Sequence, residues 1–205
     1  MPRDKSESHE KIITAAYDEF LKYGFKDASM RRIAAACDMS AAGLYRHYPS
    51  KEEMFAALVE PAFSGLKKAY LETMDLEMQQ MDDVSEESLW EESHETVMLI
   101  RYIYDNLNSF KLIVCKSQGT RYENYIHELA DIEEKLTYKY LNVLKKKGIR
   151  VKKIAPKEMH LLVTSNLSAI FTTVEHDMSI KEAVSYAKHL DMFYTAGWKK
   201  LLGIE

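Results

Sequence analysis

A short segment near the N-terminus concentrates side chains that can hold phosphate groups. Its four hydrogen-bond donors fall within seven residues: Tyr45, Arg46, His47 and Lys51. The preceding Ala-Ala-Gly at 41–43 has almost no side chain, so the backbone there can approach another molecule closely. Lys51 stands where a further helix is expected to begin, and the amides at a helix N-terminus favour an anion. The segment therefore predicts contacts with a phosphate backbone.

Three helices are predicted to position this segment. Apolar residues recur with helical spacing from Ser8 onward, and Gly24 provides a stop. Ser29 and Ser40 are each placed to cap a helix of about two turns, and Pro49 closes the second of these. Two short helices after a longer amphipathic one are the arrangement in which the second short helix can enter the DNA major groove.

The rest of the chain is predicted to be helical as well. Ser50-Lys51-Glu52-Glu53 matches a capping box that opens a fourth helix, in which Pro61 predicts a kink or an interruption. The acidic run 75–95 predicts a solvated loop and a helix start. Helical patterns then resume in five segments, 88–107, 109–116, 122–147, 156–176 and 179–202. We expect an all-α fold, with a three-helix helix-turn-helix head over residues 1–55 joined by the fourth helix to a helical domain over residues 56–205.

Residues 29–52, SMRRIAAACDMSAAGLYRHYPSKE, resemble the DNA-binding signature of the TetR family of transcriptional regulators, and the similarity covers residues 8–60. The resemblance implies roles for individual positions. It implies phosphate contacts for Ser29, Tyr45, His47 and Lys51, and contacts with bases and backbone for Ser40, Ala41 and Ala42. Arg46 adds a further donor on the same helix. One of Arg31 and Arg32 is expected to face DNA, and we assign Arg31.

Two positions depart from the common family pattern. Asp38 stands in the turn where the family usually has glycine, and Asp tolerates the left-handed conformation better than most residues do. Gly43 stands one place later than the usual glycine, which is replaced by Ala42. The turn between the two short helices is therefore still predicted, while the individual base contacts stay open.

Net charge, taken over the whole chain, argues against a nucleic-acid binder, because the formal value is −4. Residues 1–55 are neutral, with nine Lys or Arg and nine Asp or Glu, so the deficit lies in the remainder. Within the head, residues 39–51 hold two cations and no acid. This distribution predicts a binder of modest non-specific affinity, whose contacts are concentrated on one short helix and its flanks.

The C-terminal segments fit a domain that binds a ligand and a second subunit. Residues 159–174 are apolar on nearly every side, as expected of a helix covered on both faces. The resemblance implies a twofold homodimer through the last two helices; burial within one subunit stays open as the alternative. Candidate pocket positions, each of which also fits an ordinary core, are Leu66, Tyr70, Met74, Met98, Tyr102, Phe110, Tyr125, Asn166 and Phe171.

Other classes of protein find little support in the sequence. Glu91-x-x-His94 has the spacing of a di-iron helix, but no second copy follows. Neither Cys37 nor Cys115 has a local histidine that would activate it, so no enzyme, metal site or cofactor is predicted. Two cysteines exclude a disulfide scaffold. The charged first ten residues predict no signal peptide, and the longest uncharged stretch is too short to span a membrane, so a cytoplasmic location is expected.

These observations together predict a dimeric regulator that binds a palindromic DNA operator. By resemblance, repression is expected more than activation, with release of the operator when an unidentified small molecule enters the C-terminal domain. A helical ligand-binding or protein-interaction module whose head no longer binds DNA stays open as the alternative.

Overall fold

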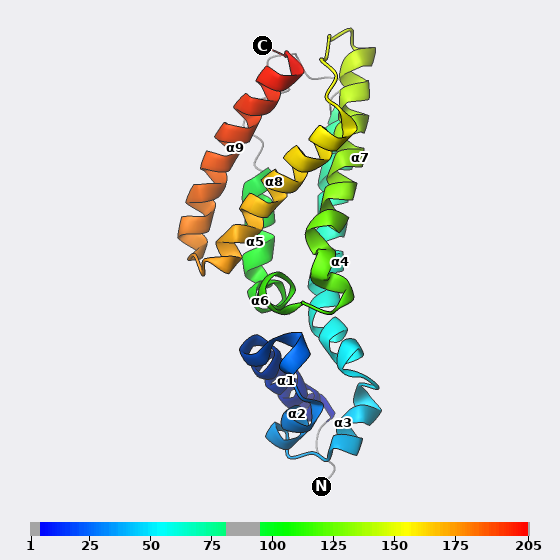
Figure 1. Cartoon of the computed structure of the whole chain (residues 1–205), viewed down its shortest axis with the longest axis vertical. Helices are drawn as coiled ribbons and strands as arrows, with labels where there is room; N and C mark the ends of the chain where they lie inside the picture. The colour runs from blue at the N-terminus through cyan, green and yellow to red at the C-terminus, as the bar shows by residue number, and fades with distance from the viewer. Residues whose placement is uncertain (1–4, 81–94, 205) are drawn as a thin grey trace. The chain divides into compact units, whose positions relative to one another are not determined.

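The computed structural model describes residues 5–80 and 95–204, and the regular structure in these ranges is entirely helical (Figure 1). The elements are α1 (Lys5–Asp27), α2 (Met30–Ala36), α3 (Ala41–His47), α4 (Lys51–Gln80), α5 (Glu95–Asp105), α6 (Leu107–Lys116), the 3-10 turn η2 (Arg121–Asn124), α7 (Tyr125–Lys146), α8 (Pro156–Glu175) and α9 (Ile180–Leu202). The all-α prediction is confirmed. Among the described residues, no helix combines the length and the apolar character that crossing a membrane requires.

The chain forms two compact units. The first comprises Met1–Gly65 and Asn106–Glu123, and the second comprises Leu66–Asp105 and Asn124–Glu205. This division differs from the sequence-based boundary at residue 55, because α6 joins the first unit. The Ser109 hydroxyl on α6 donates to the carbonyl of Leu58 at 2.8 Å and lies 2.8 Å from the hydroxyl of Tyr17 on α1. Helix α6 therefore completes the core of the DNA-binding head that the sequence predicted.

Aromatic rings form the centre of the first unit. The ring of Phe55 meets Phe20 and Phe25 edge-on, with centroids 5.2 and 5.5 Å apart. Edge-to-face pairs add roughly 0.5–1.5 kcal/mol beyond the area that they bury. This core supports α2 and α3, which have seven residues each and are too short to be stable as isolated helices.

Three backbone positions were singled out by the sequence. Gly24 adopts φ +72° and breaks α1, which resumes for one short turn to Asp27. Asp38 has φ +55°, so the left-handed turn predicted between the two short helices is confirmed. A kink or an interruption was predicted at Pro61, and the structure shows no interruption, because α4 runs through this residue. Pro61 lies on the exposed side, and so does Ala57, whose carbonyl loses its helical partner; water can bind that carbonyl instead.

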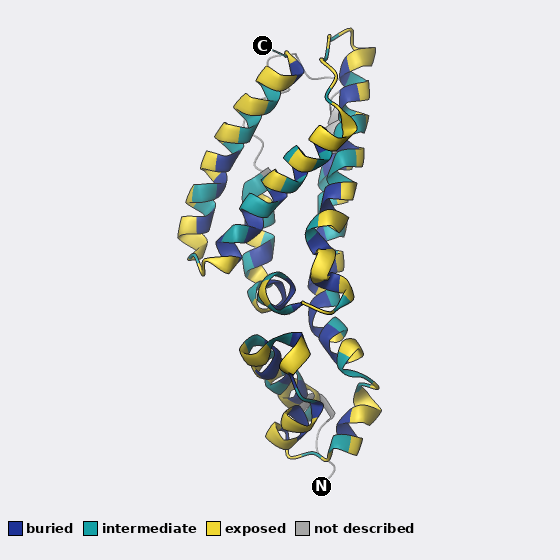
Figure 2. Cartoon of the chain, viewed as in Figure 1, coloured by how far each residue is buried: buried dark blue, intermediate teal, exposed yellow. Residues whose placement is uncertain are grey.

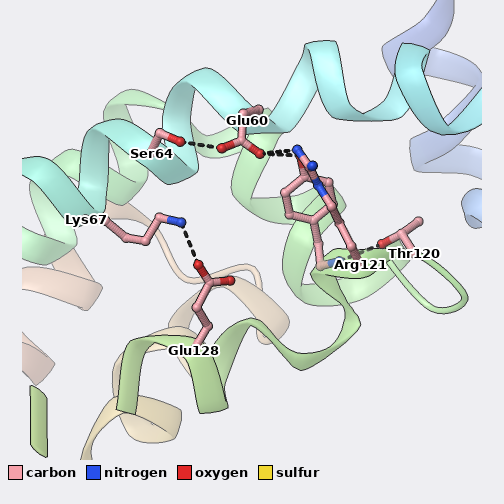
Figure 3. Close-up of polar contacts among 7 residues, drawn as sticks. Glu60, Ser64, Lys67, Thr120, Arg121 and Glu128 are labelled. Atoms are coloured by element: carbon pink, nitrogen blue, oxygen red, sulfur yellow. Dashed lines mark hydrogen bonds and ion pairs between the residues drawn. The ribbon is translucent and has the colours of Figure 1, made fainter. Parts of the chain in front are cut away.

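Within the first unit, the carboxylate of Glu60 on α4 anchors the η2 turn (Figure 3). Its Oε2 accepts hydrogen bonds from Tyr122 Oη at 2.5 Å and from Arg121 Nη2 at 2.6 Å, and Ser64 donates to its Oε1. Burial alone would raise the pKa of Glu60, but these donors together hold it below its usual value. Burial and the hydrogen bond to Glu60 raise the pKa of Tyr122 to about 12. Tyr122 is thus a permanent donor at physiological pH.

The second unit is built on packed helix pairs, α7 with α8, α8 with α9, and α5 with α9. The hydroxyl of Tyr104 on α5 lies 2.9 Å from the carbonyl of Met178 and 3.2 Å from that of Thr173, at the end of α8. Lys67 on α4 pairs with Glu128 on α7 at 2.6 Å, as Figure 3 shows. The inward sides of α7, α8 and α9 are buried and their other sides exposed (Figure 2).

One acidic side chain lies unpaired within the packing of the second unit. Glu133 on α7 accepts a hydrogen bond from Thr137 through Oε1, at 3.2 Å. Its Oε2 is shielded from solvent and has no hydrogen-bond partner among the described residues. Burial therefore disfavours the ionised carboxylate and raises its pKa from the usual 4.5 to about 7.

Glu133→Gln is expected to stabilise the protein at neutral and alkaline pH. In the wild type the folded state holds this proton more tightly than the unfolded state does, so stability falls as pH rises from 4.5 to about 7 and is level above. The variant removes that loss, which amounts to about 1–3 kcal/mol at pH 8 and vanishes near pH 4. Chemical denaturation over this pH range measures the difference. Glu175→Gln, at an exposed position on α8, serves as control; parallel curves for wild type and Glu133→Gln would contradict the expectation.

Candidate nucleic-acid interface

Helix α3 is held by its inner face and presents its polar residues outward. Leu44 is fully buried, and Gly43 is buried beside it. A Cβ at Gly43 would lie 3.3 Å from the Ser40 hydroxyl, so a side chain at this position would crowd the start of α3. Tyr45, Arg46 and His47 are all exposed, and 46% of Tyr45 is accessible to solvent. The side chains predicted to bind phosphate therefore share a free surface.

The two serines at the helix starts behave differently. The Ser40 hydroxyl accepts a hydrogen bond from the Gly43 amide at 3.0 Å, so it caps α3 as predicted. The predicted cap at Ser29 is wrong, because its hydroxyl makes no capping hydrogen bond. Instead, the buried Glu19 carboxylate lies at this end of α2, where it accepts a hydrogen bond from the backbone amide of Ser29 at 2.7 Å.

Arg31 and Arg32, adjacent in sequence, have different surroundings. Arg32 donates through Nε to Glu19 at 2.8 Å and through Nη2 to the Asp27 carbonyl at 2.7 Å. Its guanidinium also lies 4.3 Å from the centroid of the Tyr23 ring. Arg31 is exposed and shares none of these contacts. Arg32 thus holds α2 against α1, while Arg31, the residue assigned from the sequence, is available to a ligand.

Lys51 has a structural task in addition to the phosphate contact implied by resemblance. Its ammonium donates to the carbonyls of Lys26 at 2.9 Å and Ala28 at 3.3 Å, and it lies 4.6 Å from the centroid of the Phe25 ring. An ammonium carries three donors, so one is left for an external acceptor. Lys51 therefore joins the end of α1 to the start of α4.

The remaining predicted positions lie around the start of α3. Ala42 and Ser40 are exposed and Ala41 is half-buried, so the backbone there is accessible. Cys37 lies beneath, at the end of α2, where burial raises the pKa of its thiol and makes it a poor nucleophile. Cys115, on α6, is exposed. The Glu91-x-x-His94 motif falls outside the described residues.

Small apolar cavities lie among the described residues of the second unit, and two of them share part of their lining. The inner one has a volume of about 20 Å³, and its lining includes Ile103, Leu129 and Phe171. The outer one, of about 170 Å³, is bordered by Met98 and Tyr102. Leu66, Tyr70 and Leu99 line both. These three side chains thus form the border between the two spaces. Typical ligand pockets have about 300–1,000 Å³, so each space by itself is too small for a large ligand.

The structure distributes the nine candidate pocket residues over several environments. Five of them line one or both cavities: Leu66, Tyr70, Met98, Tyr102 and Phe171. Tyr125 packs edge-on against Phe171, with ring centroids 5.1 Å apart. Met74 is buried and Asn166 half-buried, but neither lines a cavity, and Phe110 belongs to the first unit. The sequence missed Leu99, Ile103, Leu129, Leu167 and Ile170, because aliphatic residues at helical spacing do not distinguish a cavity wall from ordinary core.

The sequence similarity to known proteins is concentrated in the N-terminal head. The family model "Bacterial regulatory proteins, tetR family" matches residues 12–58. The HTH-type transcriptional regulator UidR of Escherichia coli K12 is 34% identical over 59 residues, and that of Shigella flexneri gives the same values. These matches cover 29% of this chain and 30% of the relatives, so the chain matches less than a third of their length.

Solved structures extend the similarity of fold to nearly the whole chain. The TetR family regulator PfmR from Thermus thermophilus superposes with a TM-score of 0.60, at 20% identity over 90% of this chain and 94% of its own. A putative TetR-family regulator from Syntrophomonas wolfei gives 0.62, at 14% identity over 98% of this chain and 100% of its own. The TM-scores show that the fold is shared, and at sequence identities this low the fold is all that the superpositions show.

Proposed function

We propose that the chain, whose residues 12–58 match the family model of the tetR regulators, is a DNA-binding transcriptional repressor that leaves its operator when a small apolar molecule binds the second unit. The proposal of DNA binding rests on a difference between side chains in the first unit. Arg32 is engaged in the fold, while Arg31, Tyr45 and Arg46 are exposed. Exposed donors on the two short helices, Arg31 on α2 and Tyr45 and Arg46 on α3, suit phosphate and base contacts.

The proposed dimer uses the outer faces of α8 and α9. Three large apolar side chains there are exposed over most of their surface, namely Leu161 at 67%, Met192 at 66% and Phe193 at 72%. Ala196 and Gly197 follow on α9, and a Cβ on Gly197 would have open space around it. Small residues beside a large aromatic one allow a second helix to approach closely, which supports an isologous contact between two copies.

A twofold dimer of this kind sets the form of the operator. Two copies of α3 must enter the major groove about 34 Å apart to read both halves of a palindrome. Helix α4 contributes residues to both compact units, so it is the covalent route by which a ligand in the second unit would change the spacing of the heads.

The proposed effector is mainly apolar, because the cavities are lined by aliphatic and aromatic side chains. Hydroxyl groups from Tyr70, Thr73 and Tyr102 offer the few polar contacts that would orient it. Displacement of the three shared side chains Leu66, Tyr70 and Leu99 would join the two spaces. Effector binding therefore requires a rearrangement within the second unit.

Arg46→Ala and Tyr45→Phe are each expected to weaken binding to the DNA upstream of the protein's own gene by about tenfold or more, because each removes a phosphate donor from both heads. Fluorescence anisotropy over a range of salt concentrations measures this. Arg46→Ala should also lower the slope of log affinity against log salt by roughly one for each head.

Arg32→Ala is the matched control for Arg46→Ala. It should lower the thermal midpoint of the protein by leaving the Glu19 carboxylate without its cationic partner, whereas Arg46→Ala should leave the midpoint unchanged. Unchanged DNA affinity in Arg46→Ala and Tyr45→Phe, or absence of binding by the wild type, would favour the helical module that does not bind DNA.

Phe193→Glu is expected to shift the protein from dimer to monomer, because a charge would replace the most exposed of the three large apolar side chains. Sedimentation velocity at micromolar concentration separates the two states. Asn142→Glu adds the same charge on the exposed side of α7 and should leave the dimer intact. A dimer that survives Phe193→Glu would place the contact elsewhere.

Tyr70→Ala is expected to strengthen binding of the apolar probe anilinonaphthalene sulfonate several-fold, because it removes the bulkiest of the three side chains that line both cavities. Probe fluorescence measures the affinity, and operator release measured at the same probe concentrations tests the coupling. Tyr45→Ala, which removes an exposed tyrosine from the first unit, is the control. Equal probe affinity in the Tyr70 variant and the wild type would contradict the assigned pocket.

A further inference from the structure

The packed pair α7 and α8 carries a group of metal-ligating side chains that the function proposed above does not use. Helix α7 contributes His127, Asp131 and Glu134, which are four and three residues apart and therefore lie on one face of the helix. Helix α8 contributes His160 from its first half. The sequence predicted no metal site, because the fourth residue is distant along the chain and no local motif joins it to the other three.

Three of these side chains meet between the two helices, and the fourth, His127, lies beside them. Nδ1 of His160 lies 3.3 Å from Oε2 of Glu134, and one ligand atom from each of Asp131, Glu134 and His160 lies within 4.8 Å of the other two. The imidazole of His127 stacks on that of His160, with ring centroids 5.7 Å apart and planes inclined by only 6°. Each of the two helices thus brings a histidine to the same place.

These distances are close to those of a bound transition-metal ion. Carboxylate oxygens and imidazole nitrogens bind Zn²⁺ at about 2.0–2.2 Å, so two ligands of a tetrahedral ion lie about 3.4 Å apart. Glu134 and His160 keep 20% and 33% of their side-chain surface exposed, and Asp131 is exposed, which leaves a path for an ion to enter.

The donor set also restricts the kind of ion. Two carboxylates bring two negative charges, and imidazole nitrogens are ligands that Zn²⁺, Ni²⁺ and Co²⁺ accept readily, while Mg²⁺ and Ca²⁺ prefer oxygen alone. A plain interhelical ion pair would need only Glu134 and His160. It gives no reason for a second carboxylate and a parallel second imidazole at the same point.

We propose that Asp131, Glu134 and His160 form a binding site for a divalent transition-metal ion, with His127 turning to supply the fourth ligand. The ion would join α7 to α8 within the second unit. This proposal does not depend on DNA binding, so either one can fail while the other stands.

Titration of the metal-stripped full chain with zinc chloride in a calorimeter tests the proposal. The expected result is one ion for each chain at this site and a rise in the thermal midpoint on zinc addition. His160→Ala and Glu134→Gln should each weaken zinc binding by at least about tenfold, the lower end of what even a supporting residue costs at a metal site. Excess magnesium should not compete. His176→Ala, which removes an exposed histidine at the end of α8, should bind zinc as the wild type does.

Cobalt as a spectroscopic probe keeps the test decisive even if a variant loses stability. The wild type loaded with Co²⁺ should show visible absorption bands of a low-symmetry site with nitrogen ligands, and His160→Gln, which keeps a polar side chain between the helices, should lose or shift them. Zinc affinity in His160→Ala equal to that of the wild type would overturn the proposal. So would substoichiometric binding, or bands that His160→Gln leaves unchanged.

Discussion

The packing of the short helices in the first unit depends on one buried carboxylate. Glu19 is 8% exposed, and a charge so placed costs several kcal/mol unless it is paired and hydrogen-bonded. The Ser29 amide and the Arg32 guanidinium meet that requirement, and both belong to the start of α2. Because the turn at Asp38 links α2 to α3 directly, this pairing also fixes the helix whose outer face carries Tyr45 and Arg46.

Basic residues of this head therefore fall into two groups, those that bond within the fold and those that are exposed to solvent. Arg32 and Lys51 bind acceptors of the protein itself, a carboxylate in one case and helix-end carbonyls in the other. Arg31 and Arg46 are exposed and share none of these contacts. A lysine or arginine that matches a family motif is for this reason not automatically a DNA contact, and its partners in the fold decide how a substitution should be interpreted.

Helical periodicity predicted the elements well, because each helix buries a continuous apolar stripe. The segments 109–116 and 156–176 lie within one or two residues of the observed α6 and α8. Tertiary contacts explain the misses. A cap was predicted at Ser29 because its type suits one, but Glu19, ten residues away, occupies that end of α2. Periodicity likewise could not assign α6 to the first unit, since Ser109 meets Leu58 only in the fold.

The same limit applies to the candidate sites, and more strongly. The exposed polar face of α3 was predictable because a compact motif encodes it, whereas the cavity lining draws on four helices with similar aliphatic patterns. His160 approaches Glu134 from another helix, 26 residues along the chain, which no spacing rule for a single helix detects. Local signals therefore describe the head well and the second unit only in outline.

The wall formed by Leu66, Tyr70 and Leu99 has a thermodynamic consequence for any molecule that binds behind it. An inner space of about 20 Å³ has room for about one water molecule, so the closed arrangement forgoes little packing energy. The open arrangement must then be a minor population, and the apparent affinity of a ligand equals its intrinsic affinity multiplied by the open fraction. Substitutions in this wall would therefore tune the sensitivity of the protein through the open fraction, in addition to any contact with the ligand that they change.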